Sequence, residues 1–153
     1  MKSTISKTFV LAAIAAILVS FTSNLGGEGF QISLNGKMML QQFGKDMDAV
    51  KTISLAGAVP TDQLNIRYYH CGKTGKNKVL TIKDSKNNLL KEWQFKELSA
   101  NNEMNCKVQD LMNLKKTNDP VLKLYYTSSE LPEGRQLVSV SFSPTSDHAS
   151  IKK

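Results

Sequence analysis

The chain has 153 residues, with 20 Lys or Arg against 13 Asp or Glu, and a formal net charge of +7. This length suits one domain with a hydrophobic core. No run of five or more Lys or Arg residues occurs, so the basic tails typical of nucleic-acid-binding chains are excluded.

The first 23 residues follow the three-part pattern of a secretory signal peptide. Lys2 and Lys7 make the start positive, residues 9–19 are apolar, and residues 20–23 are mainly small and polar. The apolar run is well short of the roughly 20 residues that a membrane-spanning helix needs. We expect cleavage between Ser20 and Asn24. Residues 21–23 match the small-residue rule poorly, and an uncleaved membrane anchor is the alternative.

An export signal places the protein in the periplasm or outside the cell. Removal of residues 1–23 leaves 130 residues with a net charge of +5, because the removed segment carries two lysines and no acids. Export argues against nucleic acid as a partner, and the positive charge favours an anionic glycan or another envelope protein. Membrane contact is expected only through an uncleaved signal. No cofactor is predicted.

The two cysteines are interpreted in the light of this compartment. The chain has two cysteines, Cys71 and Cys106, and an oxidising environment favours a disulfide between them. Closing a loop of this length would remove about 3–4 kcal/mol of unfolded-state entropy. Two separately buried thiols are the alternative.

Apolar and polar residues alternate with period two along most of the chain after the signal, which predicts β-strands. Asn35-Gly36 predicts a tight hairpin, because both positions of such a turn need positive φ. The expected strands are 29–34, 37–43, a segment around Ile53 and Leu55, 63–70, 78–83, 89–95, 121–127 and 135–142.

Residues 99–116 fit two structures. Met104, Val108 and Leu111 have helical spacing, whereas Met104, Cys106 and Val108 have strand spacing. We expect a short strand through Cys106, followed by a helical turn near 109–116. Pro120 prevents a helix from continuing further.

Short strands separated by turn signals predict an all-β fold, namely an antiparallel β-sandwich of about seven or eight strands with one short helix. An open barrel is the alternative. The domain is expected at 24–143, between the signal peptide at 1–23 and a polar tail at 144–153 that is predicted to be disordered.

No catalytic or metal-binding set emerges from the sequence. Gly72-Lys73-Thr74 matches the end of a phosphate-binding loop, but Arg67 stands where that motif requires its first glycine. His70 and Cys71 are adjacent in a predicted strand, so their side chains point to opposite faces. We therefore expect His70 to be a satisfied residue at a strand end. An enzyme using His70 ranks last among the functions considered, and no metal site is predicted.

The best candidate binding surface is a basic loop after the predicted strand 63–70. Its residues, together with two on the outer face of that strand, are Arg67, Tyr69, His70, Lys73, Lys76 and Lys78. Cationic side chains beside a tyrosine suit an anionic sugar or phosphate, and binding residues concentrate on loops. A hairpin tip kept soluble by its lysines is the alternative.

Several short segments underlie a resemblance to known proteins. They are Ile32-Ser-Leu-Asn-Gly36, Tyr69-His-Cys-Gly72, Leu90-Lys-Glu-Trp93, Met104-Asn-Cys106 and Glu130-Leu-Pro-Glu-Gly-Arg135. With these segments the chain resembles small exported β-sandwich proteins of Gram-negative bacteria that have no assigned activity. The resemblance implies export and fold, and it implies no functional residues.

The sequence thus favours a non-enzymatic exported binding module that takes an anionic glycan or an envelope protein. The alternative is a structural or assembly component of an envelope complex that acts through an exposed strand edge.

Overall fold

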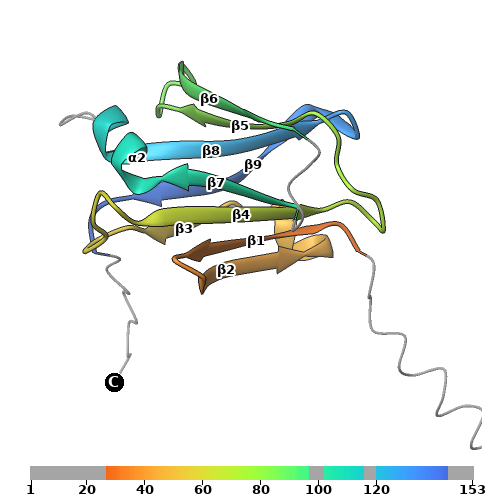
Figure 1. Cartoon of the computed structure of the whole chain (residues 1–153), viewed down its shortest axis with the longest axis horizontal. Helices are drawn as coiled ribbons and strands as arrows, with labels where there is room; N and C mark the ends of the chain where they lie inside the picture. Colours follow the sequence, from red (N-terminus) through yellow and green to blue (C-terminus); the bar gives the residue numbers. More distant parts are fainter. Residues whose placement is uncertain (1–26, 97–101, 116–119, 145–153) are drawn as a thin grey trace, which may run out of the picture.

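Two β-sheets and one short α-helix make up the described part of the chain (Figure 1). The computed structural model describes residues 27–96, 102–115 and 120–144. The predicted signal peptide and all but the first residue of the predicted tail lie outside these ranges. The all-β class is confirmed. Within the described ranges, no helix is both long and apolar enough to cross a membrane.

The first sheet has four strands, all paired antiparallel. Its order is β2 (Lys37–Phe43), β1 (Gly29–Leu34), β4 (Gln63–Tyr69) and β7 (Glu103–Lys107). The predicted hairpin at Asn35-Gly36 is confirmed, with φ of 49° and 81° at its two residues. The Asn35 side chain accepts a hydrogen bond from the Gln63 backbone N–H at 2.9 Å, which ties the hairpin to β4.

The second sheet has five strands, so the described residues contain nine rather than seven or eight. Its order is β3 (Lys51–Ser54), β9 (Leu131–Ser141), β8 (Val121–Ser128), β5 (Lys78–Lys83) and β6 (Leu89–Phe95). The pairing of β3 with β9 is parallel, against the expectation of antiparallel pairing throughout. The 3₁₀ helix η2 (Gly44–Asp48) after β2 carries the chain to the other sheet, where β3 meets the last strand.

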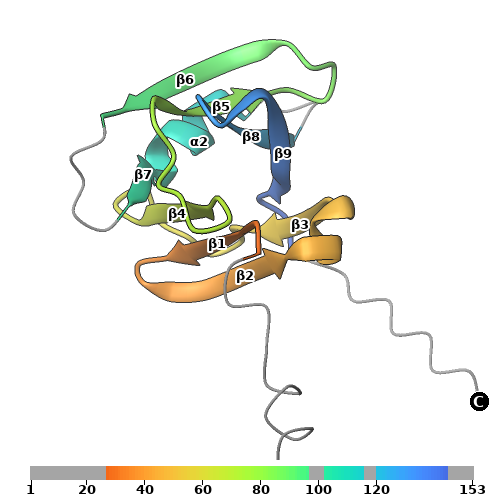
Figure 2. The same cartoon turned by 90° about the vertical axis from the view of Figure 1, so that its right-hand side faces the viewer.

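The core forms between the inner faces of the two sheets, which enclose it when viewed along the strands (Figure 2). Strand alternation explains its composition, because every second residue of β4 and β8 is buried. Tyr68 of β4 stacks on Tyr126 of β8, with ring centroids 4.3 Å apart. This contact joins the two inner faces directly.

The region around Cys106 follows the predicted order of strand and helix. Strand β7 contains Cys106, and α2 (Val108–Leu114) follows at once. Val108 and Leu111 of α2 are buried in the core. An ion pair of 3.0 Å between Lys91 Nζ and Asp110 Oδ1 links the helix to β6.

The predicted disulfide is wrong, since both cysteines are free. Cys71 is exposed in the turn after β4, whereas Cys106 is buried in β7 opposite Leu64. Leu64 lies seven residues before Cys71, which corresponds to roughly 23 Å along an extended strand. A disulfide needs Cα atoms within about 7 Å of each other. The sequence could not show that the two cysteines lie at opposite ends of the β4–β7 pair.

Candidate functional site

The outer side of the four-stranded sheet carries a continuous row of polar side chains. On β4 the residues Leu64, Ile66 and Tyr68 are buried in the core, so Arg67 and Tyr69 project from the other side. We call this surface the polar face, which consists of Gln31, Ser33, Gln41, Asn65, Arg67, Tyr69 and Glu103. The strand register brings these residues together from all four strands.

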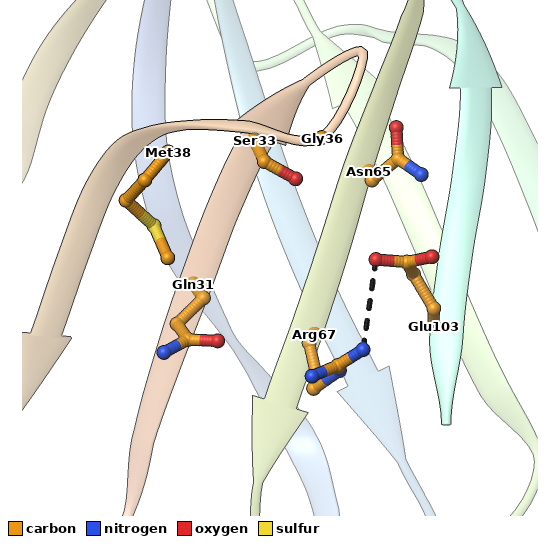
Figure 3. Close-up of a pocket in the computed structure, with 7 residues that line it drawn as sticks. All are labelled: Gln31, Ser33, Gly36, Met38, Asn65, Arg67 and Glu103. Carbon is orange, nitrogen blue, oxygen red and sulfur yellow. Dashed lines mark ion pairs between the residues drawn. The ribbon is translucent and has the colours of Figure 1, made fainter. Parts of the chain in front are cut away.

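A pocket of about 190 Å³ opens on the polar face (Figure 3). Residues of all four strands and of the β1–β2 turn line it, namely Gln31, Ser33, Gly36, Met38, Asn65, Arg67 and Glu103. Figure 3 shows the Arg67 side chain turned toward Glu103 across the gap between β4 and β7. The pocket is therefore lined mainly by groups that donate or accept hydrogen bonds.

Two polar atoms of this pocket's residues lack partners. The ion pair between Arg67 Nη2 and Glu103 Oε1 is long, at 3.8 Å, and both side chains are partly exposed, so it contributes little to stability. Arg67 Nε and Asn65 Oδ1 are buried and have no hydrogen-bond partner among the described residues. Buried polar atoms are normally paired, so these two atoms are exceptions.

The opposite end of the polar face is held in place by hydrogen bonds and an aromatic contact. The Tyr69 hydroxyl donates to Gln31 Oε1 at 2.7 Å, and Gln31 Nε2 donates to Gln41 Oε1 at 3.1 Å. The Tyr69 ring contacts Phe43, with centroids 5.5 Å apart. A Cβ atom at Gly29 would overlap the Phe43 ring, so glycine at this position allows the ring to lie against the sheet. These contacts fix the orientation of the amides and the aromatic pair.

The predicted binding residues divide into three groups. Arg67 and Tyr69 share the polar face, as expected for the outer side of their strand. Lys73 and Lys76 are exposed in the β4–β5 loop (residues 70–77). His70 is only 8% exposed and is buried, so it does not belong to a solvent-facing basic cluster.

Lys78, at the start of β5, is also removed from solvent. It is 2% exposed, and its Nζ donates to Asn102 Oδ1 at 2.6 Å. The fold therefore does not present the expected basic surface at this loop. Its four predicted residues were His70, Lys73, Lys76 and Lys78, and only Lys73 and Lys76 are exposed.

His70 belongs to a buried polar cluster between the sheets. Its Nε2 lies 2.8 Å from the Tyr126 hydroxyl and 3.3 Å from Ser128 Oγ. Burial lowers the pKa of His70 and raises the pKa of Tyr126 to about 12. Gly75 of the β4–β5 loop covers these side chains, since a Cβ atom there would lie 2.5 Å from the Tyr126 hydroxyl. The cluster is closed to solvent, which suits a structural role.

A second part of the same cluster lies beside Tyr68. The Tyr68 hydroxyl donates to Glu28 Oε1, and Glu28 Oε2 forms an ion pair of 3.5 Å with Arg135 Nη2. Burial and the neighbouring Glu28 carboxylate hold the pKa of Tyr68 well above its ordinary value. This cluster connects the chain just before β1 to β9, and sequence reasoning missed it because its members are far apart along the chain.

Sequence reasoning also missed five members of the polar face: Gln31, Ser33, Gln41, Asn65 and Glu103. Their signal was the polar half of the strand alternation, which identifies outward positions but not their neighbours. Within the described residues, no three or more His, Cys, Asp or Glu side chains form a group that could hold a metal ion. Comparisons of the chain with family models, curated proteins and solved structures found no match.

Proposed function

We propose that the protein is a non-enzymatic binding module of the cell envelope that holds an acidic glycan on the polar face. In this proposal the signal peptide exports the chain and the two sheets form the predicted β-sandwich. The observation that carries it is the Arg67 guanidinium, whose side chain is 36% exposed at the pocket and has only a 3.8 Å ion pair with Glu103. An anionic group of a ligand can therefore reach this guanidinium from solvent.

The side chains of the polar face suit a polyhydroxylated ligand. A hydroxyl group donates one hydrogen bond and accepts others, and an amide side chain offers both a carbonyl acceptor and N–H donors. Gln41, Gln31 and Asn65 present such amides on three adjacent strands. Neighbouring hydroxyls of one sugar chain can therefore bind across the strands.

The aromatic pair extends this surface. Tyr69 follows Arg67 on the same side of β4, about 7 Å further along the strand. The Phe43–Tyr69 pair provides apolar ring surface with a polar hydroxyl at its edge, which suits the mixed character of a sugar ring. An extended ligand can thus occupy the pocket and contact the rings at the same time.

An acidic glycan fits better than a neutral one for two reasons. The Arg67 guanidinium, with its weak partner Glu103 at 3.8 Å, can give a carboxylate or sulfate the two parallel hydrogen bonds that such groups favour. Lys73 and Lys76 lie exposed in the loop beyond Tyr69, and the whole chain is positively charged. Both features attract a polyanion.

Calorimetry with oligogalacturonate as the acidic probe and dextran oligomers as the neutral probe tests the proposal. We expect the acidic probe to bind more tightly than the neutral one. Arg67→Ala should lower the affinity for the acidic probe at least tenfold. Arg67→Lys keeps the charge but not the paired donors, so it should recover only part of the affinity. Equal affinity of the wild type and Arg67→Ala, or binding of neither probe, would contradict the proposal.

A matched pair of tyrosines provides the internal control. Tyr69 and Tyr125 each donate a hydrogen bond to a glutamine, Tyr69 to Gln31 on the polar face and Tyr125 to Gln136 on the other sheet. Tyr69→Phe should lower the affinity for the acidic probe, because Gln31 loses the hydrogen bond that fixes its orientation. Tyr125→Phe should leave the affinity unchanged.

A further inference from the structure

The pocket on the polar face contains one positive and one negative side chain. Among the described residues that line it, only Arg67 and Glu103 are charged. The strand register places them directly opposite each other on β4 and β7. Met104, the next residue of β7, is buried in the core, so the Glu103 side chain projects to the same outer side as Arg67. A ligand group that reaches Arg67 therefore also meets the Glu103 carboxylate.

Both charged groups keep most of their hydrogen-bonding capacity. The 3.8 Å between Arg67 Nη2 and Glu103 Oε1 exceeds hydrogen-bond distance, and the two side chains are 36% and 29% exposed. Figure 3 shows one carboxylate oxygen of Glu103 toward Arg67 and the other directed away from it. Within the described ranges, the Glu103 carboxylate has no second ion pair. It can therefore accept hydrogen bonds from a ligand.

A purely acidic ligand leaves this carboxylate mismatched. An acidic group bound to Arg67 would lie close to Glu103, and like charges repel each other. No lysine lines the pocket, so a compensating positive charge must come from the ligand. An ammonium group supplies that charge together with three donors and no acceptor. Its hydrogen bonds to a carboxylate are stronger than those of a neutral hydroxyl.

We propose that the glycan held on the polar face carries a free amine on the sugar next to its acidic group. This inference rests on the proposed glycan site and names the class of its ligand. The acidic group receives hydrogen bonds from Arg67, and the neighbouring ammonium donates to Glu103. The four charges then alternate in sign around the pocket, which is an electrostatically complementary arrangement.

An acetylated amine fits this position less well. Acetylation removes the positive charge, leaves a single N–H donor and adds a carbonyl acceptor. The added carbonyl would find a second acceptor, the Glu103 carboxylate, where it needs a donor. The site should therefore distinguish a free amino sugar from its acetylated form.

A hyaluronan tetrasaccharide and its N-deacetylated form are matched probes for this distinction. Both alternate glucuronate with an amino sugar, and they differ only in the acetyl groups. In calorimetry on the full chain, we expect the deacetylated form to bind about fivefold more tightly. It carries less net negative charge, so attraction to a positively charged protein would by itself give the opposite order.

Glu103→Gln is the decisive variant, because the amide keeps the shape of the side chain and removes its charge. The preference for the free amine should be lost, and the more anionic acetylated form should then bind more tightly. Glu133→Gln is the matched control, since it removes an exposed carboxylate from β9 of the other sheet and changes the net charge equally. This control should keep the wild-type order of affinity.

Circular dichroism checks that both variants fold. If Glu103→Gln does not fold, the wild type provides a second measurement. At a pH above the pKa of the sugar amine the ammonium becomes neutral, so the wild type should lose its preference for the deacetylated probe.

The inference is overturned if the wild type binds the acetylated form equally well or better. It is also overturned if the preference survives in Glu103→Gln, or if Glu133→Gln removes it to the same extent. Binding of oligogalacturonate that depends on Arg67, without discrimination between the tetrasaccharides, would contradict this inference and leave the glycan site standing. Unchanged binding of all acidic probes in Arg67→Ala would instead contradict the glycan site itself.

Discussion

The Nε2 atom of His70 lies 2.8 Å from the Tyr126 hydroxyl, and this contact joins the end of β4 to β8 across the core. Ser128 Oγ lies 3.3 Å from the same nitrogen, and Gly75 covers the group from the loop. Both hydroxyls approach the same ring nitrogen, so an unprotonated Nε2 of the neutral imidazole can accept hydrogen bonds from them. The end of the molecule near the β4–β5 loop therefore depends on an uncharged histidine.

The first prediction is a loss of stability in mild acid. Burial, together with the positive charge of Lys78, lowers the pKa of His70 below its ordinary value, while Glu130 and Glu28 act in the opposite direction. The unfolded chain accepts the proton at about pH 6.5, before the folded chain does. The contribution of neutral His70 to the free energy of unfolding should thus be fully present above pH 6.5. It should decrease as the pH falls below this value, until His70 is also protonated in the folded state.

Urea unfolding at pH 7.5 and pH 5 measures this effect. The His70→Gln variant cannot take up the proton at this position, so its stability should change less between the two pH values. An equal loss in the wild type and in His70→Gln would show that His70 is not the responsible group. The carboxyl groups with a lowered pKa, Asp62 and Glu130, titrate below this range.

The second prediction concerns the close approach of Gly75 to the buried cluster. In Gly75→Ala the new methyl group would lie 2.5 Å from the Tyr126 hydroxyl and 2.8 Å from His70 Nε2, so one of them must move. We expect destabilisation by about 1–3 kcal/mol in chemical unfolding, as is typical of overpacking. Gly27→Ala is the matched control, because no atom lies within 4 Å of its new methyl group. Equal stability of the two variants would contradict the described loop position.

The third prediction distinguishes the two thiols. Cys71 is exposed, whereas burial raises the pKa of Cys106 to about 12, which keeps its thiol protonated and unreactive. A thiol reagent such as dithionitrobenzoate should therefore modify one cysteine in the folded protein and two in urea. Cys71→Ser should remove the fast reaction. Absence of any reactive thiol in urea without reductant would instead indicate a disulfide.

The fourth prediction separates two roles of Asn35 in the β1–β2 turn. Its φ of 49° favours glycine or asparagine, and its side chain donates to Asp62 at 2.8 Å and accepts from the Gln63 N–H at 2.9 Å. Asn35→Ala loses both features and should destabilise by about 1–3 kcal/mol. Asn35→Gly keeps the backbone preference, so it should lose less. Thermal unfolding measures the difference, and equal loss in both variants would contradict the role of φ.

Local patterns in the sequence predicted the elements well. The strands at 29–34, 37–43 and 78–83 have the predicted bounds, because alternation and turn residues act within a few positions. The order of a strand through Cys106 and a helix after it was also confirmed. The conformation of Asn35 and Gly36 follows from the turn that these two residue types favour.

Long-range relationships were not predictable in this way. Arg67 meets Glu103 only because β7 pairs with β4, and no local pattern states which strands become neighbours. The same reason explains the wrong disulfide and the unforeseen burial of His70 and Lys78. Alternation identified Arg67 and Tyr69 as outward residues, but it could not show that Gln31 and Asn65 would complete their surface.

The parallel pairing of β3 with β9 has a consequence for the order of assembly. Strand β3 belongs to the first half of the chain, yet its partner within the described residues is the last strand. Until residues 131–141 have emerged, β3 cannot join its sheet, and its side of the core remains uncovered. The native core can therefore close only after residues 131–141 are present, and contacts between segments so far apart in the sequence are expected to slow folding.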